Sequence, residues 1–146
     1  MTGTNGDDNF QGTTGNDTWS GLAGRDGADG KAGSDKLCGD DDNDGGAQAP
    51  ATFRGGSGAD TLEGGLGNDT LRGDDQNDSL KGQAGDDTLR GGNGAQDSLV
   101  GADGNDDLHG DLGDSDYCEG NAGADTFVFG YPSNNYDGCE RFGPDT

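Results

Sequence analysis

The chain has 146 residues, of which 33 are Gly, and 30 Asp and Glu residues against 8 Lys and Arg residues give it a formal net charge of −22. Only 25% of the residues are apolar, which leaves too little apolar surface to offset chain entropy in an ordinary globular core. The charge argues against binding to nucleic acid or to an anionic membrane surface, and no apolar run approaches the roughly 18 residues of a membrane-spanning helix.

The sequence repeats a nine-residue unit thirteen times between Gly3 and Val128. The clearest run, from Gly55 to Arg90, reads GGSGADTLE, GGLGNDTLR, GDDQNDSLK, GQAGDDTLR. Gly stands first in every unit, Asp sixth, and Gly fourth in all but two. Such regularity predicts a solenoid built from stacked units.

One unit, which begins at Gly39, is longer than the pattern by seven residues. We place this insertion at Gly45–Ala51, which makes Asp44 the sixth residue of the unit and puts Phe53 at its eighth position. The alternative placement puts Gly46 at the eighth position, where an apolar residue is expected.

The eighth position is the apolar one, between mostly polar neighbours, which predicts a very short half-buried strand after each Gly-rich turn. Two units then form one coil with two strands, so that units i and i+2 stack in the same parallel sheet. One sheet receives Phe10, Ala28, Phe53, Leu71, Leu89, Leu108 and Phe127, and the other receives Trp19, Leu37, Leu62, Leu80, Leu99 and Cys118. These two thin rows cannot order the whole chain by hydrophobic burial alone.

The missing stabilisation is expected from a metal ion held by the turns. Asp carboxylates and bare backbone carbonyls are the hard oxygen ligands that Ca²⁺ prefers, whereas Mg²⁺ keeps several waters. One His and three Cys provide no repeated ligand set for zinc or copper. The alternative is a polar solenoid whose Asp side chains cap turns without a metal. The candidate ligands are Asp8, Asp17, Asp26, Asp35, Asp44, Asp60, Asp69, Asp78, Asp87, Asp97, Asp106, Asp116 and Asp125.

The unit resembles the repeats-in-toxin (RTX) nonapeptide, G-G-x-G-x-D-x-U-x, where U is a large apolar residue. The resemblance implies a right-handed parallel β-roll that folds when Ca²⁺ binds. It implies that each ion lies between turns i and i+2, held by the two Asp side chains and by carbonyls of the Gly-rich turns, such as those of Gly55, Gly58, Gly64, Gly67, Gly82 and Gly85. Same-side Asp pairs then give at most about 11 ions.

The repeat ends at residue 128, and we expect residues 129–146 to form a C-terminal cap in which Tyr131, Pro132, Tyr136 and Phe142 cover the last coil. A disulfide between Cys118 and Cys139 would join cap and coil in an oxidising compartment. The alternative is a buried thiol at Cys118 and an unrelated one at Cys139. Cys38 is left over, as a free thiol or a point of pairing between chains.

These features predict a secreted, monomeric calcium-binding module that is free-standing or part of a larger protein. Its calcium-induced folding would assist the export, or the stability, of a parent enzyme, toxin or adhesin chain. An adhesin, matrix or surface-layer interaction module with the same fold is the alternative. We expect no enzyme, because the single histidine, His109, takes an outward ninth position and no nucleophile or phosphate-loop motif is present.

Overall fold

The computed structural model describes residues 1–22, 25–40, 50–113, 115–128 and 139–142. This part of the chain is built from β-strands alone, and it includes no helix that could span a membrane. The strands are β1 (Asn9–Gln11), β2 (Thr18–Ser20), β3 (Gly27–Ala32), β4 (Lys36–Asp40), β5 (Thr52–Ser57), β6 (Thr61–Leu66), β7 (Thr70–Asp75), β8 (Ser79–Ala84), β9 (Thr88–Asn93), β10 (Ser98–Asp103), β11 (Asp107–Asp111), β12 (Asp116–Ala122), β13 (Thr126–Val128) and β14 (Cys139–Phe142).

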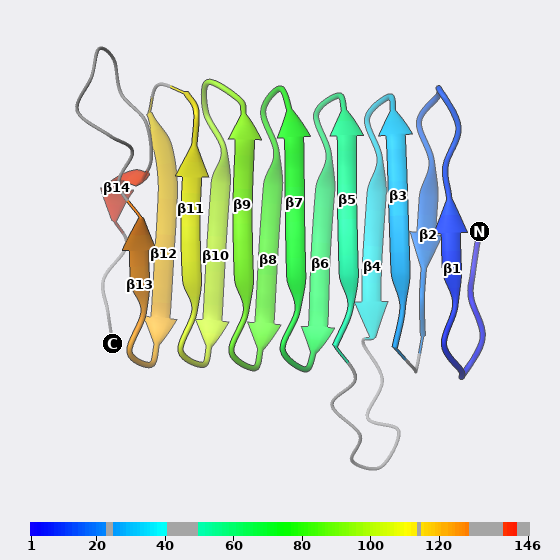
Figure 1. The fold of residues 1–146 in the computed structure, drawn as a ribbon, viewed down its shortest axis with the longest axis horizontal. Helices are drawn as coiled ribbons and strands as arrows, with labels where there is room; N and C mark the ends of the chain where they lie inside the picture. Colours follow the sequence, from blue (N-terminus) through cyan, green and yellow to red (C-terminus); the bar gives the residue numbers. More distant parts are fainter. Residues whose placement is uncertain (23–24, 41–49, 114, 129–138, 143–146) are drawn as a thin grey trace.

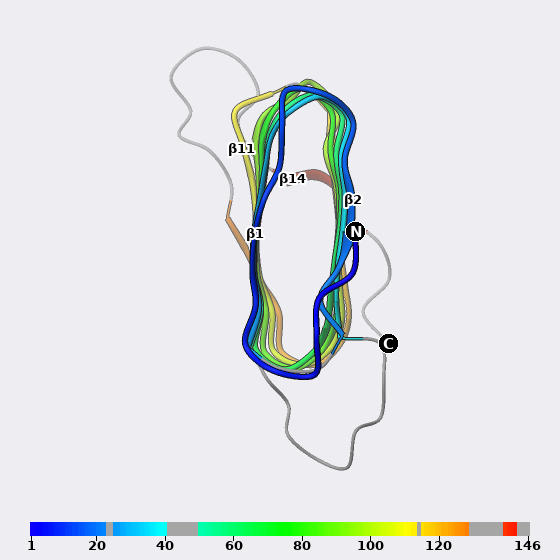
Figure 2. The same ribbon diagram turned by 90° about the vertical axis from the view of Figure 1, so that its right-hand side faces the viewer.

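The strands form two parallel sheets of seven strands each. The odd sheet has the order β1-β3-β5-β7-β9-β11-β13, and the even sheet has the order β14-β12-β10-β8-β6-β4-β2. Successive strands alternate between the sheets along the whole array (Figure 1). Viewed along the array, the coils superimpose as a flattened ring whose two long sides are the two sheets (Figure 2). The predicted all-β fold, a parallel β-roll with two units per coil, is therefore confirmed.

The register aligns the eighth positions of the units, as the repeat predicts. Phe53 lies opposite Ala28 on one side and Leu71 on the other, so Thr52-Phe53-Arg54 completes its unit after the insertion. In the even sheet, Leu80 lies between Leu62 and Leu99. These side chains are almost fully buried and form one core cluster between the sheets.

The core is bulkiest near the N-terminal end of the roll. Phe10 and Trp19 stack with ring centroids 5.7 Å apart, and Trp19 meets Phe53 edge-on at 5.8 Å. The small side chain of Ala28 lies in the same row between Phe10 and Phe53. Farther along, the core narrows to single leucines, such as Leu71 and Leu89, whose side chains are completely buried.

Strands β1, β2 and β13 have the three residues that the sequence pattern predicts, but the other strands are longer. Strand β6 continues through Gly64 and Gly65 and ends at Leu66, so the turn proper is only the fourth to sixth residues of the unit. The strand continues because the first Gly packs inward without a Cβ, while the second residue adopts a positive φ, 111° at Gly65. Non-glycine residues take the same conformation at this position, including Lys31 (φ 77°) and Asp74 (φ 84°).

The C-terminal segment contributes a strand of its own. Strand β14 extends the even sheet beside β12, with Asp116 opposite Cys139 and Cys118 opposite Phe142. Tyr131, Pro132 and Tyr136, which we expected to cover the last coil, lie outside the described residues.

Candidate metal centre

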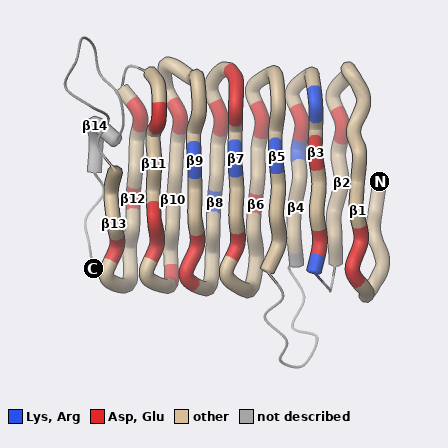
Figure 3. The backbone as a smooth tube through the Cα atoms, in the orientation of Figure 1, with Lys and Arg blue, Asp and Glu red and all other residues tan. Residues whose placement is uncertain are grey.

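The sixth-position Asp residues form two ladders, one along each edge of the roll where the chain turns. Acidic residues recur at these edges in the view of Figure 3. In each ladder, the Oδ1 atom of one Asp accepts a hydrogen bond from the backbone N–H of the Asp one coil earlier. The N–H of Asp60 donates to Asp78 Oδ1 at 2.8 Å, and that of Asp78 donates to Asp97 Oδ1 at 2.9 Å.

Nine of the predicted same-side pairs are brought together in this way, with N···O distances of 2.7–3.0 Å. They are Asp8–Asp26, Asp17–Asp35, Asp35–Asp60, Asp60–Asp78, Asp69–Asp87, Asp78–Asp97, Asp87–Asp106, Asp97–Asp116 and Asp106–Asp125.

One rung of the first ladder differs from the prediction. The N–H of Ala51 donates to Asp69 Oδ1 at 2.7 Å, and Thr70 N–H donates to the Ala51 carbonyl at 3.0 Å. Ala51 thus takes the sixth position in the register, which the sequence alignment gave to Asp44, and it belongs to the repeat rather than to the insertion. Asp44 itself lies outside the described residues. Length alone could not place the insertion, because Phe53 stays at the eighth position whether Asp44 or Ala51 is taken as the sixth residue.

The second carboxylate oxygen of most ladder residues has no hydrogen-bond partner in the described structure. This Oδ2 atom is also shielded from solvent. It is so in Asp35, Asp60, Asp69, Asp78, Asp87, Asp97, Asp106 and Asp125. Buried polar atoms are rarely left without a partner. A whole row of such oxygen atoms therefore indicates a site for a cation that these oxygens would coordinate.

Burial also disfavours the charged form of these carboxyl groups. Desolvation is the main cause that raises the pKa of Asp78 to about 8 and that of Asp87 to about 7, although each accepts a backbone hydrogen bond that acts in the opposite direction. The pKa values of Asp69 and Asp97 rise to about 6 for the same reason. Neighbouring carboxylates of the ladder add to the effect at Asp78 and Asp87.

The glycines of the repeat leave the space in which these oxygens lie. A Cβ at Gly64 would come within 2.2 Å of Asp69 Oδ2 and 2.8 Å of the Gly82 carbonyl oxygen. A Cβ at Gly85, where φ is 134°, would lie 1.9 Å from the Gly67 carbonyl oxygen. Neighbouring coils therefore approach backbone to backbone at the turns, and carbonyl oxygens from the Gly-rich segments lie beside the carboxylate ladders.

In the first rung of each ladder, the Oδ2 atom of the Asp accepts hydrogen bonds from the protein itself. Asp8 Oδ2 accepts a hydrogen bond from the Thr4 hydroxyl at 2.8 Å, and Asp17 Oδ2 accepts one from the Thr13 hydroxyl at 3.0 Å. The backbone N–H groups of the same threonines also donate to these oxygens. The N-terminal rungs therefore have partners within the protein that the interior rungs lack.

A second set of turn contacts was missed by the sequence analysis. Fifth-position Asn and Asp side chains accept hydrogen bonds from the backbone N–H of the following coil, as Asn68 Oδ1 does from Asp86 at 3.0 Å and Asp86 Oδ1 does from Asn105 at 2.8 Å. These bonds run in the opposite direction to those of the sixth position. The signal was the frequent Asn or Asp at position five, but interruptions such as Arg25 and Ala59 hid it.

This donor set fits Ca²⁺ better than a softer metal. No group of three or more His, Cys, Asp or Glu side chains within the described ranges is arranged to hold a metal ion. An ion at a turn would therefore take one or two carboxylates and complete its shell with backbone carbonyls, which is an all-oxygen environment with the high coordination number that Ca²⁺ tolerates.

The sequence profile of the RTX calcium-binding nonapeptide repeat matches the chain at residues 2–37, 52–80, 63–95, 81–116 and 96–127. The matches leave a gap only at residues 38–51, around the insertion in the fifth unit. No curated protein sequence matches the chain. The profile and the register agree on the repeat from one end of the roll to the other, and the chain therefore belongs to the RTX calcium-binding nonapeptide repeat family.

Proposed function

We propose that this chain binds Ca²⁺ along both edges of the roll and that binding is coupled to folding. The observation that carries the proposal is the row of buried Oδ2 atoms without partners. Bound Ca²⁺ would give these buried oxygens a positively charged partner. The ligands would be the Asp Oδ2 atoms and the carbonyl oxygens of residues such as Gly64, Gly67, Gly82 and Gly85. Gly55 and Gly58 are proposed as carbonyl ligands in the same way.

We propose nine sites, within the sequence-based limit of about 11, because nine same-side Asp pairs lie in register in the described part of the chain. The sequence analysis paired Asp44 with Asp26 and with Asp69. In the described register, Ala51 takes the place of Asp44 beside both of these residues. Nine calcium ions would bring about eighteen positive charges against a net charge of −22. Calcium would therefore remove most of the self-repulsion that opposes compaction of the metal-free chain.

We further propose that the module is secreted and monomeric, with the roll at residues 1–128 and the cap at residues 129–146. Low intracellular Ca²⁺ would keep it extended for export, and external Ca²⁺ would fold it and stabilise a parent chain. RTX repeats are calcium-binding structural units, which supports the expectation that the module is not an enzyme. An extracellular interaction module is the second candidate, and the polar trough described below favours it.

The first prediction concerns Asp78, which belongs to two pairs in the second ladder. Circular dichroism of the wild type should change from disordered to β structure on Ca²⁺ addition but not on Mg²⁺ addition. Asp78→Asn should raise the Ca²⁺ concentration at the folding midpoint, because two neighbouring sites lose a charged ligand. The matched control is Asp103→Asn, which removes the same charge from an exposed position and should leave the midpoint nearly unchanged. A wild type that is fully folded and indifferent to Ca²⁺ would refute the proposed function.

The second prediction concerns the rung at Ala51. Ala51→Asp should restore the ladder between Asp26 and Asp69 and raise the Ca²⁺ stoichiometry from about nine by up to two ions per chain. Equilibrium dialysis with metal analysis measures the ratio directly. A wild type that already binds eleven ions, or a variant that gains none, would show that the register at Ala51 does not limit the ladder.

The third prediction is a reversal of pH dependence by Ca²⁺. Because burial raises the pKa values of Asp69, Asp78, Asp87 and Asp97 above the ordinary 3.8, the metal-free roll should be most stable near about pH 4 and lose stability as the pH rises through about 6 to 8. With Ca²⁺ present, protons compete with the ion, so the midpoint concentration should rise as the pH falls from about 8 to 5. Parallel dichroism titrations in chelator and in Ca²⁺ test both directions. Metal-free stability that increases with pH over this range would contradict the assignment.

We also propose the Cys118–Cys139 disulfide, which would tie strand β14 to the roll. Its support is the pairing of β14 with β12 and the complete burial of Cys118. Thiol titration of the unfolded, unreduced chain should find one free thiol, that of Cys38. Three thiols would rule the disulfide out, and a chain-to-chain dimer through Cys38 would appear on a non-reducing gel.

A further inference from the structure

The outer face of the odd sheet carries two adjoining hollows of about 410 and 260 Å³. Gly56 contributes to the lining of the larger hollow and Gly92 to that of the smaller one. Both glycines are second-position residues with positive φ, 109° and 117°. Because neither has a side chain, the sheet surface is open at these two points. Arg72, Asp74 and Asn93 line both hollows, so the two form one continuous trough.

The register sets the spacing of the trough. Across β3, β5, β7, β9 and β11, the second-position row reads Lys31, Gly56, Asp74, Gly92 and Asp111. Glycine therefore alternates with a charged side chain. Since neighbouring strands lie about 4.8 Å apart, the two hollows repeat at about 10 Å, which suits a chain-like ligand with a regular repeat rather than a single small molecule.

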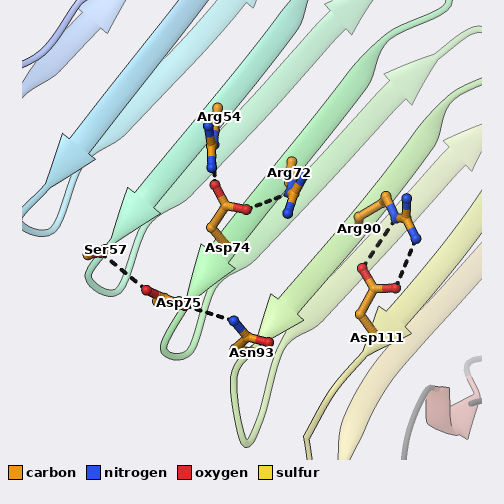
Figure 4. Close-up of polar contacts among 8 residues, drawn as sticks. All are labelled: Arg54, Ser57, Arg72, Asp74, Asp75, Arg90, Asn93 and Asp111. Carbon is orange, nitrogen blue, oxygen red and sulfur yellow. Dashed lines mark hydrogen bonds and ion pairs between the residues drawn. The ribbon is translucent and has the colours of Figure 1, made fainter.

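A ladder of arginines borders the trough. Arg54, Arg72 and Arg90 lie opposite one another on β5, β7 and β9, and they appear as aligned basic segments in Figure 3. Asp74 lies between Arg54 and Arg72 and bridges their Nε atoms (Figure 4). Arg90 is held by Asp111, with contacts of 3.2 and 3.3 Å.

The acid of this cluster is buried and the bases are exposed. The Asp74 side chain is only 10% exposed, whereas those of Arg54 and Arg72 are 57% and 56% exposed. Asp74 contacts both arginines through Nε, and in the part of the chain that the structure describes their terminal nitrogens make no hydrogen bond, so these donors are available to a ligand. A ligand that approaches the trough therefore meets two guanidinium groups before it meets Asp74, and these groups match a carboxylate in a bidentate geometry.

The other border of the trough is suited to hydroxyl groups. Asp75 accepts hydrogen bonds from Ser57 at 3.3 Å and from Asn93 at 2.9 Å, across three neighbouring strands (Figure 4). This row offers alternating donors and acceptors close to the arginine ladder. A ligand that bears both hydroxyls and regularly spaced carboxylates would use both borders at once.

We propose that this trough binds an acidic polysaccharide of uronate residues, which lies across the strands with carboxylates on Arg54 and Arg72. A nucleic acid fits less well, because its denser phosphate charge would meet Asp74, Asp75 and the net charge of the chain. A peptide ligand would need apolar pockets for its side chains, and the trough is lined almost entirely by polar residues.

The test uses the full chain, folded in Ca²⁺, with short oligogalacturonates as the probe and isothermal titration calorimetry as the measurement. Short oligomers limit gel formation by Ca²⁺, and the fully methyl-esterified oligomer is a neutral control of the same shape. We expect saturable binding of the acid form and at least tenfold weaker binding of the ester. Arg54→Gln and Arg72→Gln should each weaken binding about tenfold.

Two further variants make the test specific. Lys81→Gln removes the same charge from β8 in the opposite sheet and should leave the affinity unchanged. Asp74→Asn should strengthen binding, because it removes the buried acid and Asn tolerates the positive φ at this position. This variant and the ester comparison remain informative even if an arginine variant fails to fold.

The outcomes separate the trough from calcium bridging. Absence of saturable binding, equal binding of the ester, or equal losses in Lys81→Gln and the arginine variants would overturn the proposal. Binding that requires the acid form yet survives both arginine substitutions would assign the carboxylates to Ca²⁺ at the turns, and would equally overturn it. Calcium-dependent dichroism of each variant reports the proposed calcium function independently.

Discussion

The whole roll depends on the different roles of the two oxygen atoms of each ladder carboxylate. Oδ1 accepts a hydrogen bond from the preceding coil and so fixes the stacking of one turn on the next, as in the bond from Asp69 N–H to Asp87 Oδ1. Oδ2 is buried by the same stacking and gains no partner in most rungs. The contact that orders the turns therefore creates an electrostatic cost at every coil, and the cost recurs along the ladder. A cation or protons would relieve this cost. Burial raises the pKa of Asp78 to about 8 and that of Asp87 to about 7, so without a cation these carboxyl groups hold protons near neutral pH.

Most of the architecture follows from two periods in the sequence. The nine-residue period determines which units share a sheet, and the alternation of inward and outward residues within a strand determines which side chains form the core. Leu62, Leu80 and Leu99 are aligned from these rules alone. Phe53 is aligned too, despite the insertion, because an apolar residue is needed at the eighth position to continue the core row.

The parts that sequence reasoning missed depend on backbone conformation. The eighth-position pattern predicts three-residue strands, because it does not show that a second-position residue such as Lys31 can keep the chain in the sheet at positive φ. The sixth position of the fifth unit was assigned to Asp44 because every other unit has Asp there, whereas the hydrogen bonds of Ala51 identify the residue that takes this place. The fifth-position hydrogen bonds, such as that of Asn68, depend on the offset between neighbouring coils. The spacing of residues within a unit does not predict this offset.

Because the core and the turns hold the roll together, the residues on the outer face of each sheet are free to form a binding surface. Core residues and turn glycines are confined by packing. At the second position, a Cβ at Gly56 would lie 2.1 Å from the Lys31 carbonyl oxygen and one at Gly92 would lie 2.2 Å from that of Asp74, so glycine alternates with larger residues across the sheet. Asp74 occupies this position with φ 84°, at a cost of roughly 1–2 kcal/mol relative to an unstrained residue. Stability of the roll gives no reason for an acidic side chain there, since Gly56 and Gly92 meet the same conformational demand without strain. Asp74 instead holds two guanidinium groups that would otherwise repel each other on neighbouring strands. Positive φ recurs at other second-position residues, including Gln83 and Ala102. What is particular to Asp74 is that it keeps two like charges side by side and exposed on neighbouring strands, where a ligand of opposite charge can reach them.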